Sequence, residues 1–167
     1  MYPAPGTSFY CRFGWGWVVK YLADSMLGRL AKWLRIMGYD THYLSFYRKE
    51  DMSSLIQEGR TLLSRHRKTI NRYPGSLMIH SDHVKEQLNE IRNEFQLKPD
   101  RSHWFSRCLI CNVLLKKAEI EHLRVNVPDY ILNGNPTSLR ICPSCGRCFW
   151  PGSHRKRMLN QLEDWGF

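Results

Sequence analysis

The sequence predicts an α/β domain built on a parallel sheet, followed by a small zinc-binding module. Between residues 18 and 95, short apolar segments alternate with segments of helical periodicity. Strands that alternate with helices imply a parallel sheet covered on both faces. Farther along, two Cys-x-x-Cys pairs supply the four thiolates of a structural zinc site. The 167 residues suffice for one domain and a small appendage.

The composition favours a folded, basic protein. With 43% apolar residues the chain can bury a core, and 25 Lys and Arg against 15 Asp and Glu give a net charge of +10. Small basic domains commonly bind nucleic acid or another acidic surface. No apolar run is long enough to span a bilayer, and no secretory signal is visible. We therefore expect a reducing intracellular compartment, either the cytoplasm or an organelle matrix.

Residues 1–17 read as an N-terminal arm. Prolines and glycines argue against a regular element, whereas six aromatic residues argue against a freely solvated tail. The arm could lie on its own domain or dock on a partner, where Trp and Tyr are favoured anchors.

The α/β domain is expected over residues 18–98. Val18–Ala23 reads as a buried strand that ends at Asp24, and a helix follows from Ser25 to about Met37. Its expected apolar positions recur at helical spacing and comprise Met26, Leu27, Leu30, Ala31 and Leu34, with Arg29, Lys32 and Arg35 on the opposite side. Gly38 is a natural stop, and Gly28 inside the helix suggests that a ligand or backbone segment needs the space.

The alternation continues to the end of this domain. Further strands are predicted over residues 41–46, 61–64 and 77–80, further helices over 51–58 and 83–95, and a brief helix or turn over 65–71. Residues 98–100 read as a linker into a zinc ribbon over 99–158, and residues 159–167 as a C-terminal helix or tail that continues a helix begun near His154.

Acidic residues follow several of the predicted strands. Asp24 follows the first strand, Asp82 follows the fourth, and Glu50 and Asp51 open the second helix. Ligands gather at the carboxyl ends of parallel strands, and carboxylates there could hold Mg²⁺ or Mn²⁺. The alternative is that Asp24, Asp51 and Asp82 are helix N-caps.

The zinc ligands are predicted to be Cys108, Cys111, Cys142 and Cys145, because Cys142 to Cys145 repeats the spacing of Cys108 to Cys111. Cys148 could replace Cys145. Disulfides or unrelated thiols are the other reading of these cysteines.

Two long segments resemble the Mut-seven C-terminal RNase family. Residues 22–41, which read LADSMLGRLAKWLRIMGYDT, resemble its opening, and Cys142–Arg147 with Phe149–His154 resembles its ending. The resemblance implies a PIN-like three-layer α/β fold with a C-terminal zinc ribbon. It also implies RNA cleavage by acidic residues and a divalent cation. The positions that match the family's acidic residues are Asp24, Glu50, Asp51 and Asp82.

One position departs from the family pattern. Where the family usually reads Thr-Arg-Asp-Arg, this chain reads Ser64-Arg65-His66-Arg67, and imidazole is a poor Mg²⁺ ligand. His66 could instead bind a softer metal or act as a general base.

Two functions follow as hypotheses. The first is a metal-dependent ribonuclease, in which Arg65 contacts a phosphate. The second is a non-catalytic RNA-binding subunit of a large ribonucleoprotein such as a mitochondrial ribosome. In either, we expect five basic residues to contact RNA: Arg29, Lys32, Arg35, Arg67 and Lys68.

Overall fold

A computed structural model describes residues 19–118, 127 and 138–167. Within this part the chain forms two compact units. The first comprises residues 19–34 and 39–96, and the second comprises residues 35–38 and 97–167 with its gaps. The predicted arm over residues 1–17 lies outside the described residues.

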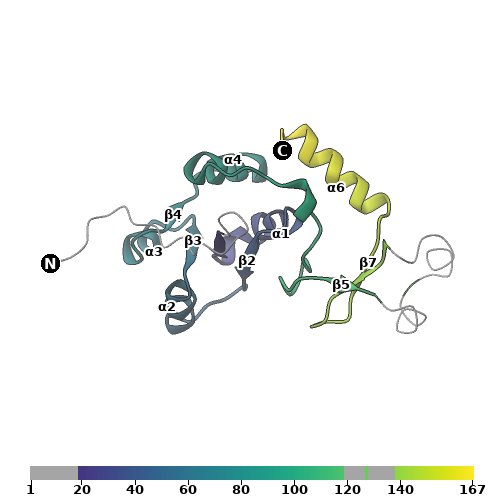
Figure 1. Ribbon diagram of the computed structural model, residues 1–167. Coiled ribbons are helices and arrows are strands. Elements are labelled where there is room, and N and C mark those ends of the chain that lie inside the picture. The colour runs from purple at the N-terminus through teal and green to yellow at the C-terminus, as the bar shows by residue number, and fades with distance from the viewer. Residues whose placement is uncertain (1–18, 119–126, 128–137) are drawn as a thin grey trace. The chain divides into compact units, whose positions relative to one another are not determined.

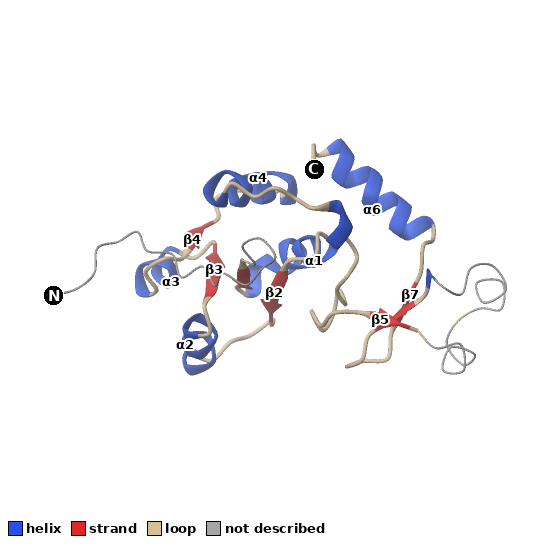
Figure 2. Cartoon of the chain, viewed as in Figure 1, coloured by secondary structure: helices blue, strands red, loops and turns tan. Residues whose placement is uncertain are grey.

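The first unit contains a four-stranded sheet of order β2-β1-β3-β4 in which every pairing is parallel. Helices flank the sheet (Figures 1 and 2). The strands are β1 (Lys20–Ala23), β2 (Asp40–Tyr43), β3 (Arg60–Ser64) and β4 (Leu77–Met78), and the helices are α1 (Gly28–Ile36), α2 (Lys49–Gln57), α3 (Arg67–Arg72) and α4 (Val84–Phe95). The predicted α/β fold with a parallel sheet is confirmed.

The central strands are buried because the sheet is covered by helices. In β1 the residues Tyr21, Leu22 and Ala23 have no exposed surface, and Leu62 and Leu63 of β3 are equally enclosed. Burial on both faces explains why these strands read as continuous apolar runs rather than alternating ones. Helices contribute Leu30, Ala31, Leu34, Leu88 and Ile91 to this core.

The start of the first predicted helix differs from expectation. Residues Ser25–Leu27 form the 3₁₀ turn η1, and α1 begins only at Gly28. Three residues per turn shift the phase of the side chains, so Met26 is 61% exposed instead of packing on the apolar side. The space beside Gly28 is taken by the Tyr43 side chain, whose hydroxyl would lie 2.7 Å from an added Cβ.

Gly38 ends α1 as predicted. Its N–H donates to the Arg35 carbonyl (3.0 Å), the next N–H, of Tyr39, donates to Leu34 (2.9 Å), and its φ is +89°. This is the Schellman arrangement, which favours glycine at the left-handed position. The site is also crowded, because a Cβ at Gly38 would lie 2.5 Å from the carbonyl oxygen of His103.

The second unit contains a three-stranded antiparallel sheet of order β5-β6-β7. Its elements are η2 (Arg101–His103), β5 (Lys116–Lys117), β6 (Arg140–Ile141), β7 (Cys148–Phe149) and α6 (Ser153–Asp164). Ala118, Val127 and Leu139 form a small core against which Ile141, Cys148 and Trp150 pack. Strand β5 follows the first Cys-x-x-Cys turn, and β6 and β7 stand on either side of the second. This arrangement is compatible with the predicted zinc ribbon.

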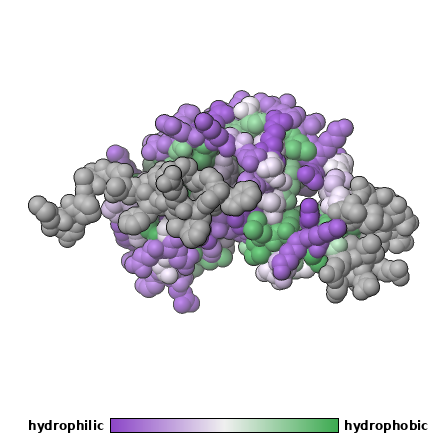
Figure 3. Space-filling model, viewed as in Figure 1, coloured by the Kyte–Doolittle hydropathy of each residue, from purple (hydrophilic) through white to green (hydrophobic). Residues whose placement is uncertain are grey.

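The surface of the described chain agrees with its polar composition. On the face drawn in Figure 3, hydrophilic groups cover most of the described surface, and hydrophobic groups form smaller patches. Within the described ranges, no helix has the length and hydropathy needed to cross a membrane.

We expect Gly38→Ala to destabilise the protein more than Gly59→Ala does. Both glycines have positive φ, +89° and +83°, so alanine costs about 1–2 kcal/mol of backbone strain at either position. Only Gly38 adds a collision with backbone, since no atom lies within 4 Å of a Cβ built on Gly59. Urea denaturation of both variants measures the difference, and equal losses of unfolding free energy would contradict this account.

Candidate functional site

Asp24 and Asp82 lie at the same edge of the sheet. Asp24 directly follows β1 and Asp82 follows β4, and parallel strands present their carboxyl ends at one edge. Asp24 is 6% exposed. Its carboxylate accepts hydrogen bonds from the Met26 N–H (2.9 Å), the Arg65 N–H (3.3 Å) and the Ser64 hydroxyl. Three donors occupy most of the roughly four lone-pair positions of a carboxylate.

Ser64 is the residue at this edge that the sequence analysis did not single out. It ends β3 and is fully buried. Its hydroxyl donates to Asp24 and accepts from the N–H of His66 (2.9 Å). The sequence could have indicated Ser64, because it is a polar residue at the end of an apolar strand and a buried hydroxyl needs a hydrogen-bond partner.

Arg65 connects the two aspartates. Its backbone N–H bonds Asp24, and its guanidinium forms an ion pair with Asp82 at 2.5 Å. The side chain of Asp82 is 73% exposed and that of Arg65 is 26% exposed, so solvent screens the pair and its contribution to stability is small. In this arrangement Arg65, which we expected to contact a phosphate, is engaged by Asp82.

Helix α4 holds the segment that precedes Asp82. The carboxylate of Glu90 accepts from the backbone N–H groups of His80 (2.8 Å) and Ser81 (2.9 Å). The buried Gln87 side chain donates to the Ser81 carbonyl at 2.9 Å. These bonds position Asp82 although its own side chain is exposed.

The capping alternative is correct for only one of the three aspartates. Asp24 is the N-cap of η1. The N-cap of α2 is Arg48, and Asp51 lies with Glu50 in the first turn of that helix. Asp82 precedes the N-cap of α4, which is His83. Glu50 and Asp51 are both exposed.

Asp24, Asp51 and Asp82 do not converge as a group of three ligands. Over residues 19–118, 127 and 138–167, one group of three or more potential ligand side chains has all its ligand atoms within 4.8 Å, and it consists of cysteines alone. Mg²⁺ binds oxygen ligands at about 2 Å, so Asp24, Asp51 and Asp82 do not all three meet at one ion as they lie.

His66 does not complete the acidic group. It is exposed at the start of α3, and its Nδ1 lies 3.3 Å from the Thr69 hydroxyl.

Four of the five basic residues expected to contact RNA are exposed, namely Arg29, Lys32, Arg67 and Lys68. The fifth needs correction. Arg35 is only 4% exposed, and its guanidinium donates to the carbonyl oxygens of Leu109 (2.8 Å) and Ile110 (3.0 Å). It lies in the last turn of α1, where it is used to hold the first Cys-x-x-Cys turn.

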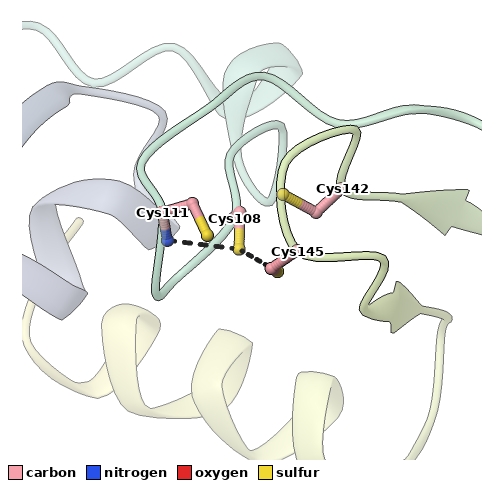
Figure 4. Close-up of side chains that lie close together, drawn as sticks. All are labelled: Cys108, Cys111, Cys142 and Cys145. Atoms are coloured by element: carbon pink, nitrogen blue, oxygen red, sulfur yellow. Dashed lines mark hydrogen bonds between the residues drawn. The ribbon is translucent and has the colours of Figure 1, made fainter.

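The second unit gathers the four predicted zinc ligands. Ligand atoms of Cys108, Cys111, Cys142 and Cys145 all lie within 4.8 Å of one another, and the side chains converge from two loops (Figure 4). Cys108 and Cys142 are buried. A closed set of four thiolates suits tetrahedral zinc in a structural role. These side chains therefore fit the ion that the sequence predicted.

The two cysteine turns share one hydrogen-bond pattern. In the first turn, the N–H of Cys108 donates to the carbonyl of Val113, and the carbonyl of Cys108 accepts from the N–H of Asn112. In the second turn, Cys142 makes the same two bonds with the carbonyl of Arg147 and the N–H of Gly146. All four distances are 2.9 Å. The residue directly after the second cysteine has positive φ in both turns, +63° at Asn112 and +69° at Gly146. Glycine and asparagine are the residues that tolerate this conformation best.

The thiols of the cluster have unequal proton affinities. Burial raises the pKa of Cys108 to about 12, whereas the backbone N–H of Arg147 lowers the pKa of Cys145 to about 6. Zinc binds thiolates, so loading must displace the proton that Cys108 retains.

Cys148 is not part of the cluster. It begins β7, packs against the small core of the second unit, and its sulfur lies 3.8 Å from the Gly146 carbonyl oxygen. The geometry therefore favours Cys145 as the fourth ligand.

One comparison with known proteins returned a match. The family model described as the Mut7-C RNAse domain matches residues 19–162, which is most of the chain. No curated protein and no solved structure shows significant similarity. The match confirms the resemblance seen in the sequence and indicates a nuclease-related function that concerns RNA.

We expect purified protein to bind one zinc ion, and Cys145→Ser to lose it while Cys148→Ser keeps it. Removing one of four thiolates opens the coordination shell, whereas Cys148 lies outside it. Metal analysis of the three proteins by mass spectrometry measures the ratio. If Cys148→Ser lost zinc and Cys145→Ser kept it, Cys148 would be the fourth ligand and Cys145 would lie outside the site.

Proposed function

Because the chain belongs to the Mut7-C RNAse domain family, we propose that it binds RNA at the carboxyl edge of its parallel sheet and cleaves RNA weakly or not at all. The family supplies the link to RNA. The state of the acidic residues at that edge supplies the second part of the proposal.

The proposal of reduced activity rests on one observation, namely that protein groups already bind the carboxylates at this edge. Asp24 is surrounded by three protein donors, and Asp82 is paired with Arg65. A hydrolytic metal centre needs carboxylates that are free to bind the ion and to orient water. At the position where the resemblance implies an aspartate, this chain has His66, which lies against Thr69. Each of these features weakens divalent-cation binding.

The RNA-binding part is supported by basic residues near the same edge. Arg29 lies in the first turn of α1, and Arg67 and Lys68 lie in the first turn of α3. Helices that follow parallel strands begin at the carboxyl edge, so these side chains start from the edge that carries Asp24. All three are exposed, and they form no ion pair with the described residues. Phosphate groups are the natural partners of such cations.

Zinc has a structural part in this proposal. Bound by Cys108, Cys111, Cys142 and Cys145, it would join two loops separated by thirty residues of sequence. Because no ligand position is left for water or substrate, it contributes folding free energy rather than chemistry.

A second candidate function is a structural subunit of a large ribonucleoprotein. The net charge of +10 and the engaged carboxylates favour it, since a structural subunit needs the basic surface but not the metal. Sedimentation of the native protein in cell extract separates the two. Co-migration with a large RNA particle at moderate salt supports the subunit, and a free small protein supports an independent RNA-binding protein.

We expect the double variant Arg29→Glu, Lys32→Glu to bind RNA at least tenfold more weakly than the native chain, and to show a smaller dependence on salt. Each lost phosphate contact reduces the slope of log affinity against log salt by about 1. Fluorescence anisotropy across a salt series gives both quantities. As a control, Lys98→Glu changes an exposed lysine in the linker. If Lys98→Glu lost as much RNA affinity as the double variant, the effect would come from net charge alone and not from the position of Arg29 and Lys32.

We expect the native protein to release little or no product from structured and single-stranded RNA in Mg²⁺ or Mn²⁺. The assay uses labelled RNA on denaturing gels and includes Asp82→Asn, whose exposed side chain can change without disturbing the core. Rapid cleavage by the native chain that Asp82→Asn abolishes would show a working metal centre and refute the reduced activity. RNA binding would remain valid in that case.

A further inference from the structure

Three large apolar side chains are exposed at the carboxyl edge of the sheet. Met26 follows β1, and Leu44 and Phe46 follow β2, the neighbouring strand. Their exposed fractions are 61%, 47% and 74%. The only other large apolar side chains exposed to this degree in the described chain belong to the second unit. Exposed apolar groups that gather beside a candidate site indicate a binding surface.

The loop that carries Leu44 and Phe46 is tied to the strand that leads into Asp24. The Tyr47 hydroxyl donates to the carbonyl of Ala23 (3.1 Å), the residue before Asp24. The same hydroxyl accepts from the Leu44 N–H at 2.7 Å. The apolar side chains are therefore presented on a fixed loop, which lowers the entropy lost when a ligand binds.

A second tyrosine links the same two segments. The hydroxyl of Tyr43 donates to the carbonyl of Ser25 at 3.3 Å, and its ring packs against Gly28. The turn that carries Met26 and the loop that carries Phe46 are thereby connected side by side. We refer to Met26, Leu44 and Phe46 as the apolar rim.

Cations flank the apolar rim. Arg48 and Lys49 come just after Phe46 in the chain, separated from it by Tyr47, and Arg29 lies one helical turn after Met26. All three are exposed and form no ion pair with the described part of the chain. Aromatic side chains beside cations are the combination used for single-stranded nucleic acid, where bases stack and phosphates pair. A purely apolar protein partner would leave these charges without counterparts.

We propose that the apolar rim is a stacking surface for unpaired bases, with Phe46 as its principal contact, so that the RNA recognised at this edge is single-stranded. The inference rests on the proposed function and adds the class of RNA and the residues that select it. Base faces are accessible in a single strand and hidden in a duplex.

The test is a cycle between one side chain and one base. Anisotropy is measured with a single-stranded RNA of about 12 nucleotides and with copies that each carry an abasic site at one position. Phe46→Ala is expected to weaken binding about tenfold, because an aromatic side chain contributes a substantial part of the stacking affinity. At one position, the missing base is expected to weaken binding to the native chain by a similar factor. The same abasic RNA is expected to bind Phe46→Ala almost as tightly as the intact RNA does. Phe46→Trp restores the affinity.

A matched control removes an apolar side chain elsewhere. Ile110 is 53% exposed in the first cysteine turn, and Ile110→Ala should leave RNA affinity unchanged. Two results would overturn the inference and assign the rim to a protein partner. In the first, Phe46→Ala binds RNA as tightly as the native protein. In the second, the loss of affinity caused by Phe46→Ala adds fully to the loss caused by the abasic site at every position. The proposed function survives that result. Failure of the native chain to bind any RNA overturns both.

Discussion

The parallel pairing of β1 with β3 is the constraint on which the rest of the first unit depends. Its register places Ala23 beside Leu63, so the next residues, Asp24 and Ser64, emerge together and form a hydrogen bond. The N–H of Asp24 also donates to the Leu63 carbonyl at 3.1 Å, and Ser64 in turn accepts from the N–H of Ile79 at 2.8 Å. These bonds extend the sheet's order by one residue beyond its strands. A slip of one residue would turn the buried side chains of β1 toward the opposite face.

In the proposed function, the same edge favours binding of RNA over its cleavage. The buried carboxylate of Asp24 caps η1 and joins β1 to β3, so it stabilises the fold at a position that we expected to bind metal. Removing one partner of a buried, hydrogen-bonded charge costs several kcal/mol. Asp24 would therefore be retained for stability even without catalysis. Around it lie cations and the apolar rim, two features that bind a nucleic-acid strand without chemistry.

Much of the fold could be predicted from the sequence because local signals agree with tertiary burial. Apolar runs became the buried strands, Gly38 became the stop of α1, and the Cys-x-x-Cys pairs met. What could not be predicted depends on contacts between distant segments. Arg35 carries the same charge as Lys32, but its position in the last turn directs it to carbonyl oxygens of the first cysteine turn. Equally, the spacing of acids along the chain placed Asp24 and Asp82 at one edge, but it did not show that protein donors would occupy them.

The central claim is that RNA meets the chain at the carboxyl edge of the parallel sheet. Ultraviolet crosslinking of a bound single-stranded RNA, followed by mass spectrometry of the attached peptides, tests it most directly. The account predicts crosslinks within residues 24–32 and 44–49, where the apolar rim and its flanking cations lie. Crosslinks confined to α4 or to the strands β5, β6 and β7 would contradict it.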